Sequence, residues 1–179
     1  MRTSMPQTLR ARLRRVRLLL CDVDGVLTDG TVIVRGRGDE AKRFNLRDGQ
    51  GLVLLRRCGI RVGWISSRPS AATARRAREL KVDFLVQRKG PKVAAVEEIL
   101  AHTGCSWTEV CYVGDDWVDL GPLRRAGVGV AVADAAPEVR ATARVVTQAA
   151  GGQGAVREIA DWILEAQGKK AALVAEFAA

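Results

Sequence analysis

Residues 17–30 read RLLLCDVDGVLTDG, an apolar run that ends in two aspartates and a glycine. The run at 18–21 is typical of a buried strand, and Asp22 and Asp24 follow it directly. In extended backbone, residues i and i+2 point to the same side, so both carboxylates would face one cavity, where Gly25 lets the chain turn. A divalent cation would relieve their repulsion and leave the second acid as a proton donor. Alone, the pattern is also typical of a calcium-binding or helix-capping loop.

Strand-like and helix-like stretches alternate along the rest of the chain. We expect strands at 17–22, 62–66, 84–86, 109–113, 128–132 and 145–146, and helices at 48–58, 70–80, 91–102, 116–126, 137–142 and 154–167. A β-hairpin with a glycine-rich tip is expected between 31–34 and 41–44. Repeated strand–helix units imply parallel strands joined by right-handed crossovers and covered by helices on both faces. The pattern predicts an α/β fold, a three-layer, doubly wound, Rossmann-like parallel sheet with a β-hairpin insertion after the first strand.

The length and composition suit one soluble globular domain, because the chain has 179 residues of which 47% are hydrophobic. Its apolar runs are too short to span a bilayer. We divide it into a basic lead-in at 1–16, a domain at 17–167 and a C-terminal tail at 168–179. The tail is rich in small residues and is expected to be mobile.

Most of the net charge of +9 comes from one segment, because six arginines and no acid lie within the first seventeen residues. This segment is typical of a solvated lead-in to the first strand, with a nucleic-acid tail and a transit peptide as alternatives. Leu9, Leu13 and Val16 are spaced for one face of a short docking helix. No aromatic residues are interleaved with the arginines and no recognised motif is present, so a nucleic-acid partner is not expected.

The cysteines indicate a reducing compartment. They have no CxxC pairing and no metal-ligand spacing with the single His102, and they lie in or beside apolar stretches: Cys21, Cys58, Cys105 and Cys111. This usage is typical of reduced, buried thiols, and we expect a cytoplasmic protein.

Further polar residues follow other expected strands at the same edge of the sheet. Asp115 and Asp116 follow 110–113, where they would complete an oxygen ligand set for Mg²⁺ or cap the next helix. Ser66 ends a strand at a helix start, a position that suits a phosphate oxygen or an ordinary cap. Lys92 begins a helix, where a cation opposes the macrodipole and suits an anionic partner, unless it is simply exposed. Together these positions predict a site for a divalent metal and a phosphate.

In this order, DVDGVLTDG, Ser66, Lys92 and GDDWVD resemble the four motifs of the haloacid dehalogenase superfamily of phosphotransferases, over about residues 17–167. Three more segments are similar to its capless group of 3-deoxy-D-manno-octulosonate 8-phosphate (Kdo 8-phosphate) phosphatases: FNLRDGQG at 44–51, VADAAP at 132–137 and AGGQGAVRE at 150–158. The resemblance implies no cap domain and an Mg²⁺-dependent hydrolysis of a sugar-acid phosphate monoester. Kdo 8-phosphate is the first expectation and a nonulosonate (sialic acid) 9-phosphate the alternative, because phosphatases of that second kind are close relatives.

The resemblance also implies roles for single carboxylates. Asp22 would attack phosphorus and form an aspartyl-phosphate, and Asp24 would protonate the leaving sugar oxygen and then activate water. Mg²⁺ would be held by Asp22, by the backbone carbonyl of Asp24 and by Asp115. Asp116 or Asp119 would support the waters of the metal.

The remaining implied roles concern phosphate, substrate and assembly. Ser66 and Lys92 would hold the phosphoryl oxygens. Arg47 and Arg68 are candidates for binding the substrate's acid groups or, equally, for structural ion pairs. Members of the group form homotetramers in which the hairpin, here about 31–44, packs into the assembly. The implied partners are a small sugar-acid phosphate and further copies of this chain, with no membrane.

Two features bear on a rival, non-catalytic role. The stretch CSWTEVCYVG at 105–114 is similar to the C-terminal domain of sialate cytidylyltransferases, which serves in assembly or regulation. Two departures from the family pattern bear instead on the substrate: Ser67 stands where the family usually has glycine, and Gln153 stands where it has arginine. The acids Asp22, Asp24 and Asp115 are all present, however, and this favours an enzyme.

Overall fold

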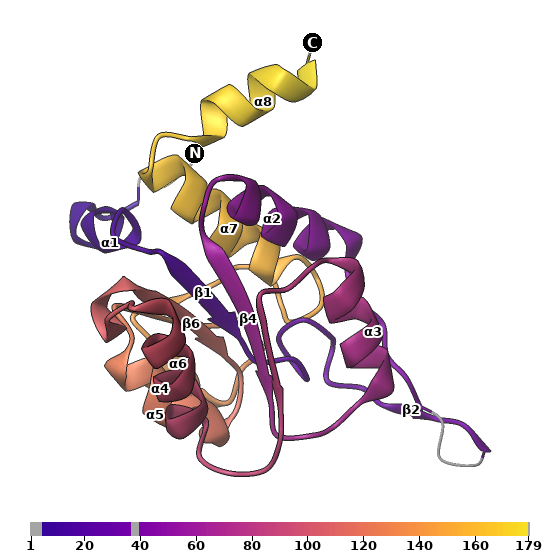
Figure 1. Cartoon of the computed structure of the whole chain (residues 1–179). Helices are drawn as coiled ribbons and strands as arrows, with labels where there is room; N and C mark the ends of the chain where they lie inside the picture. Colours follow the sequence, from indigo (N-terminus) through magenta and orange to yellow (C-terminus); the bar gives the residue numbers. More distant parts are fainter. Residues whose placement is uncertain (1–4, 37–39, 179) are drawn as a thin grey trace.

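The computed structural model describes residues 5–36 and 40–178, and within them a six-stranded parallel sheet forms the centre of the molecule (Figure 1). Its strands are β1 (Leu18–Cys21), β4 (Arg61–Ser66), β5 (Phe84–Gln87), β6 (Val110–Gly114), β7 (Val128–Ala131) and β8 (Val145–Val146). They lie in the order β5-β4-β1-β6-β7-β8, and neighbouring strands are parallel. The carboxyl end of β1 is therefore flanked by those of β4 and β6. The predicted α/β sheet is confirmed.

A small antiparallel hairpin follows β1, as expected. It consists of β2 (Ile33–Val34) and β3 (Glu40–Ala41), with Ile33 opposite Ala41 and Val34 opposite Glu40. Its paired arms are shorter than the predicted 31–34 and 41–44. Among the described residues this hairpin is the whole insertion between β1 and the next helix, so the capless architecture is confirmed.

Helices cover both faces of the sheet and give the predicted three layers. One layer contains α2 (Leu46–Arg57), α3 (Ala71–Glu79) and α7 (Ala155–Ala166), and the other contains α4 (Lys92–Thr103), α5 (Leu120–Arg125) and α6 (Pro137–Thr142) (Figure 1). Helix α2 packs against α7, and α5 packs against both α4 and α6. The four central strands are almost entirely buried, with Trp64 and Tyr112 as the largest fully buried side chains, whereas the edge strands β5 and β8 are partly exposed.

The prediction of a single helix at 116–126 is wrong at its beginning. The chain forms a 3₁₀ turn at Trp117–Asp119 before α5 begins at Leu120. Pro122 has no N–H group and is tolerated only in the first turn of a helix, so α5 begins shortly before it. Asp116 and Asp119 form a reciprocal capping box that stabilises the tight turn.

The arginine-rich N-terminal segment is anchored to the domain. Helix α1 (Gln7–Leu13) packs against α7. Arg12 of this helix and Arg14, which follows it, donate to backbone carbonyls: Arg12 Nη1 to Gly127 O at 3.2 Å and Arg14 Nε to Ala166 O at 3.1 Å. Leu13 is fully buried in the core, Val16 is 2% exposed and Leu9 packs against them. The expected docking helix is thus present, although Val16 lies beyond its end.

Shortening Leu13 to alanine is expected to lower the free energy of unfolding by about 2–5 kcal/mol, because it removes a fully buried side chain and leaves a cavity. Leu13 lies before the start of β1, at the opposite end of that strand from Asp22, so turnover at low temperature should change less than about twofold. Urea unfolding and steady-state kinetics measure the two effects. A loss of stability below about 1 kcal/mol would show that α1 does not belong to the cooperative core.

The C-terminal segment, expected as a mobile tail, forms a further helix, α8 (Lys170–Ala178), which contacts α7. The sequence KAALVAEFA contains neither glycine nor proline, which explains the helix. Lys170 forms an ion pair with Asp161 of α7 at 3.2 Å. Within the described parts of the chain, none of the helices is long and apolar enough to cross a membrane.

Candidate active site

The loop after β1 carries Asp22 and Asp24 to the centre of the sheet edge. The N–H of Asp22 donates to Val113 O at 2.9 Å, which extends the pairing of β1 with β6 by one residue. Asp22 is buried, whereas the side chain of Asp24 is 26% exposed. Gly25 turns the chain with φ +94°, and a Cβ at this position would lie only 2.0 Å from Asp115 Oδ2. Glycine is therefore required for Asp115 to approach this loop.

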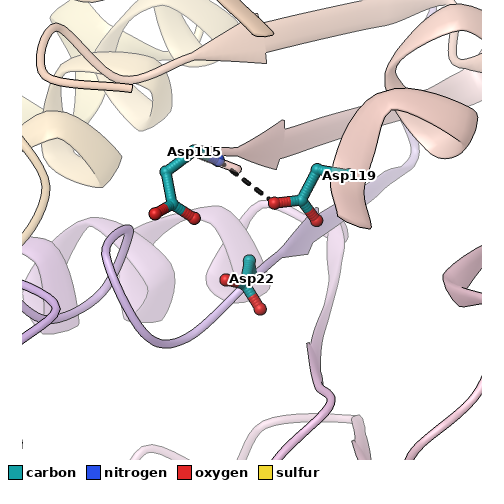
Figure 2. Close-up of side chains that lie close together, drawn as sticks. All are labelled: Asp22, Asp115 and Asp119. Atoms are coloured by element: carbon teal, nitrogen blue, oxygen red, sulfur yellow. Dashed lines mark hydrogen bonds between the residues drawn. The ribbon is translucent and has the colours of Figure 1, made fainter. Parts of the chain in front are cut away.

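Three carboxylates converge beside this loop. Figure 2 shows Asp22 facing Asp115 and Asp119, which come from the segment after β6. One oxygen of each lies within 4.8 Å of one oxygen of each of the others. Negative charges this close repel one another strongly in a buried site, so the arrangement requires compensating positive charge.

Lys92 supplies part of this charge. As the first residue of α4, it places Nζ 2.6 Å from Asp22 Oδ1 and 2.7 Å from Asp119 Oδ1, and its side chain is only 3% exposed. Burial opposes the charge of Lys92, but the carboxylates of Asp22 and Asp119 outweigh it and raise the pKa of Lys92 above its usual value. The ammonium group therefore stays charged between the two acids.

Asp119 is held by hydrogen bonds at both oxygens. Its Oδ1 accepts from Lys92 and from the hydroxyl of Tyr112, both at 2.7 Å. Its Oδ2 accepts from the backbone N–H of Asp115 at 3.1 Å, which is the dashed line in Figure 2, and from that of Asp116 at 3.4 Å. Four hydrogen bonds use the lone pairs that a metal would need. Asp119 therefore anchors Lys92 and the Asp115 loop.

Asp115 differs from Asp119 in its hydrogen bonding. Its Oδ1 is buried with no hydrogen-bond partner among the described residues. Burial, followed by the negative charges of Asp22 and Asp119, raises the pKa of Asp115 to about 8, and burial is also the main cause that raises the pKa of Asp22 to about 6. At neutral pH Asp115 therefore favours its neutral form unless a further cation is present, and burial also disfavours the charge on Asp22. An unpartnered oxygen beside a second carboxylate is the donor set that suits Mg²⁺, so the residues fit this metal.

Asp24 and Ser66 meet on the other side of Asp22. Ser66 ends β4 and is buried, and its Oγ lies 3.4 Å from Asp24 Oδ2. Ser66 Oγ also accepts from the N–H of Arg68 at 3.1 Å. The other Asp24 oxygen, Oδ1, lies 2.5 Å from Nζ of Lys42, a residue of the hairpin that the sequence reasoning did not consider. No local pattern signals Lys42, because its contact depends on how the hairpin folds back.

The similarity of this chain to known proteins agrees with this geometry. A family model for haloacid dehalogenase-like hydrolases matches residues 71–159. The 3-deoxy-D-manno-octulosonate 8-phosphate phosphatase KdsC of Yersinia pestis is 42% identical over 158 residues, which cover 88% of this chain and 84% of that protein. This chain belongs to that phosphatase family of the haloacid dehalogenase-like hydrolases. The resemblance inferred from the motifs is confirmed.

Solved structures of the phosphatase family have the same fold. The crystal structure of the Moraxella catarrhalis phosphatase, in complex with a magnesium ion, a phosphate ion and a KDO molecule, has a TM-score of 0.94 and 35% identity. The matched region spans 97% of this chain and 99% of the Moraxella catarrhalis chain. A probable phosphatase from Pseudomonas syringae has a TM-score of 0.95 and 40% identity, with 97% of this chain and 99% of that chain covered.

Two segments that indicated the phosphatase family have a supporting place in the structure. FNLRDGQG at 44–51 and AGGQGAVRE at 150–158 pack on each other, where Asp48 Oδ1 accepts from the N–H of Arg157 at 2.7 Å. Gly152 N donates to Val26 O at 2.9 Å, and a Cβ on Gly151 would lie 1.8 Å from Gly25 O. These segments therefore hold the loop that follows Asp22.

The two candidate arginines differ in their surroundings. Arg68 Nη2 lies 2.5 Å from Glu40 Oε2, so the ion-pair alternative is realised, although the side chain remains 48% exposed. Arg47 lies in the first turn of α2 and is exposed, and no ion-pair partner for it exists among residues 5–36 and 40–178. Gln153 is likewise exposed. Arg47 is thus the freer of the two for a ligand.

Mg²⁺ is expected to stabilise the protein more at high pH than at low pH. The raised pKa values mean that Asp22 and Asp115 stabilise the metal-free fold below pH about 4, a contribution that is lost as pH rises through about 6 and about 8. Since Mg²⁺ competes with these protons, its effect on Tm should be larger at about pH 8 than at about pH 5.5, by at least about 3 °C. Thermal unfolding with and without Mg²⁺ measures this, and Asp115→Asn should remove most of the difference. Equal effects at both pH values would contradict the prediction.

Proposed function

We propose that this protein is an Mg²⁺-dependent phosphatase that hydrolyses 3-deoxy-D-manno-octulosonate 8-phosphate through an aspartyl-phosphate on Asp22. The observation that carries the proposal is the position of Asp22, buried at the end of β1 with Lys92 Nζ at 2.6 Å and Asp115 beside it. A carboxylate in this setting suits nucleophilic attack on phosphorus, because nearby cations stabilise the charge that develops.

The chain's own residues account for two half-reactions. In the first, an Asp22 oxygen forms a bond to phosphorus while the bond from phosphorus to the sugar oxygen breaks, and Asp24 gives that oxygen a proton. In the second, Asp24 takes a proton from water, the water oxygen bonds to phosphorus, and the Asp22 carboxylate is released with inorganic phosphate. Covalent catalysis divides one very high barrier into two lower ones.

Mg²⁺ is proposed to be held by the Asp22 carboxylate, the backbone carbonyl of Asp24 and Asp115. It would supply positive charge that lets both acids ionise and that neutralises the phosphoryl oxygens. The unpartnered Asp115 Oδ1 supports this ligand set, and the hydrogen bonds that Asp119 already accepts favour an indirect role for Asp119. Asp119 would instead orient Lys92 and the Asp115 loop.

The phosphoryl group is proposed to bind the Ser66 hydroxyl and the Lys92 ammonium, which are both buried at this sheet edge. Charge-assisted hydrogen bonds of this kind are the strong ones for phosphate. Arg47 and Arg68 are the proposed contacts for the sugar's carboxylate, and the exposure of both supports an accessible role.

We also propose a cytoplasmic homotetramer. The four cysteines are free thiols, which suits a reducing compartment. Large apolar side chains are exposed on segments that follow strand ends, on the hairpin and at the start of α2: Ile33, Val34, Leu46, Trp117 and Val118. Exposed apolar groups of this kind favour association between copies of a chain. Light scattering after size-exclusion chromatography measures the mass, and a monomer at assay concentration would contradict this part.

The proposed substrate is tested by phosphate release from a panel. The wild-type protein with Mg²⁺ is assayed on Kdo 8-phosphate, nonulosonate 9-phosphates and simple hexose phosphates. We expect kcat/KM for Kdo 8-phosphate to exceed that for every other member by at least about tenfold, a difference of about 1.4 kcal/mol. A preference for a 9-phosphate would reassign the sugar and leave the reaction as proposed.

A further inference from the structure

A buried lysine on the hairpin contacts the proposed acid. Lys42 follows β3, and its side chain is 0% exposed. Nζ lies 2.5 Å from Asp24 Oδ1 and 3.3 Å from Thr73 Oγ1 of α3. Lysine is among the residues least often buried, because the desolvation of an unpaired ammonium group is costly. The pairing with Asp24 therefore accounts for the burial of Lys42.

Asp24 is consequently held from two sides. The Lys42 ammonium contacts Oδ1, whereas Oδ2 faces Ser66 Oγ at 3.4 Å, within the proposed phosphate site. Lys42 also lies near a second acid, because Glu40 Oε1 is 3.9 Å from its Nζ. The other oxygen of that acid, Glu40 Oε2, forms an ion pair with Arg68. These contacts connect the hairpin to the segment after β4 and leave one Asp24 oxygen directed toward Ser66.

We propose that Lys42 is a positioning residue that fixes the Asp24 carboxyl group for proton transfer. The inference rests on the proposed function, in which Asp24 gives a proton to the leaving sugar oxygen and later takes one from water. Lys42 keeps its own protons throughout and forms no bond to the substrate. Its side chain has no exposed area, unlike the candidate arginines, and its Nζ is occupied by Asp24 and Thr73.

The dependence of the rate on the leaving group separates positioning from a merely structural role. A sugar phosphate has a poor alkoxide leaving group that needs a proton, whereas p-nitrophenyl phosphate releases a stable phenolate without one. Lys42→Met removes the ammonium group and keeps the length of the side chain. With the sugar phosphate that the wild type hydrolyses fastest, kcat should fall at least about 30-fold with KM changed less than about twofold. The burst of nitrophenolate, which reports the first half-reaction, should keep its rate within about threefold.

Two control variants complete the test. Arg43→Met changes an exposed cation next to Lys42, with a 77% exposed side chain, and should leave both rates within about twofold. Asp24→Asn removes the acid itself, so its rates with the two substrates show what complete loss of proton transfer by Asp24 does. A selective loss in Asp24→Asn but not in Lys42→Met would overturn this inference alone. If Asp24→Asn itself lacks the selective loss, the acid assignment in the proposed function is overturned.

Other results are equally decisive. A rise in KM without a fall in kcat would make Lys42 a substrate-binding group, and equal losses with both substrates would make it purely structural, so each overturns the inference. If Lys42→Met does not fold, as judged by circular dichroism, Lys42→Gln is assayed in the same way. Its shorter, neutral side chain should again cause a selective loss with the sugar phosphate, and equal losses with both substrates would overturn the inference.

Discussion

Replacing Asp22 with asparagine is expected to lower kcat with the preferred sugar phosphate by at least about 10⁴-fold while the fold is retained. An amide nitrogen and oxygen cannot replace the carboxylate that attacks phosphorus, yet asparagine has nearly the same volume. Burial raises the pKa of Asp22 to about 6, so a neutral side chain removes an unfavourable buried charge. Lys92 keeps Asp119 as its second partner at 2.7 Å. The change in Tm should therefore stay within a few degrees.

The matched control is Asp29→Asn, in the same DVDGVLTDG segment. Asp29 Oδ1 accepts from the N–H of Thr31 at 3.0 Å, a contact that the amide oxygen of asparagine can keep. The kcat of Asp29→Asn should remain within about threefold of the wild-type value. Rapid acid quenching and mass spectrometry should detect a phosphorylated peptide that contains Asp22 in the wild type and none in Asp22→Asn. Turnover by Asp22→Asn above about 1% of wild type would refute Asp22 as the nucleophile.

The sequence predicted the parts of the site that depend on local order. Several chemistry-bearing residues follow or end an apolar run, and in a parallel sheet such ends meet at one edge. Asp22, Ser66 and Asp115 were placed in this way, and the structure brings them to the same edge. The sheet, the hairpin and the layers followed from the alternation of strand and helix patterns, which depends on burial at each position and is visible in one sequence.

The sequence did not reveal the contacts that depend on three-dimensional folding. The sequence offered Asp116 or Asp119 as a support for the waters of the metal. It did not indicate that Asp119 accepts from Lys92, Tyr112 and two backbone amides. That role depends on the close approach of α4 to the end of β6, which no local periodicity encodes. The Lys42–Asp24 pair depends on the hairpin folding back over the site. Long-range polar pairs leave no pattern in one sequence, because each partner alone looks like an ordinary surface charge.

Replacing Gly25 with alanine is expected to lower kcat/KM by at least about 10³-fold and to weaken Mg²⁺ binding. Two independent costs combine at this position. The backbone has φ +94°, which an L side chain rarely adopts and which costs of order 1–3 kcal/mol. In addition, the new Cβ would lie 2.0 Å from Asp115 Oδ2 and 2.6 Å from its Cγ, so either the Asp115 side chain or the loop after Asp22 must move. Both movements separate the proposed metal ligands.

Gly30→Ala separates these two costs. Gly30 lies in the same segment with φ +76°, but the nearest atom to its Cβ would be Gly25 Cα at an ordinary 3.7 Å. Alanine there carries the backbone strain without the collision, so it should lower Tm by a few degrees and leave kcat/KM within about fivefold of wild type. Mg²⁺ titration by calorimetry and steady-state kinetics compare the two variants. If Gly25→Ala binds Mg²⁺ and turns over as Gly30→Ala does, the close packing of Gly25 against Asp115 is not what holds the metal site together, and strain alone explains the glycine. If only Gly25→Ala loses both, the glycine is required because Asp115 must reach within ligand distance of Asp22.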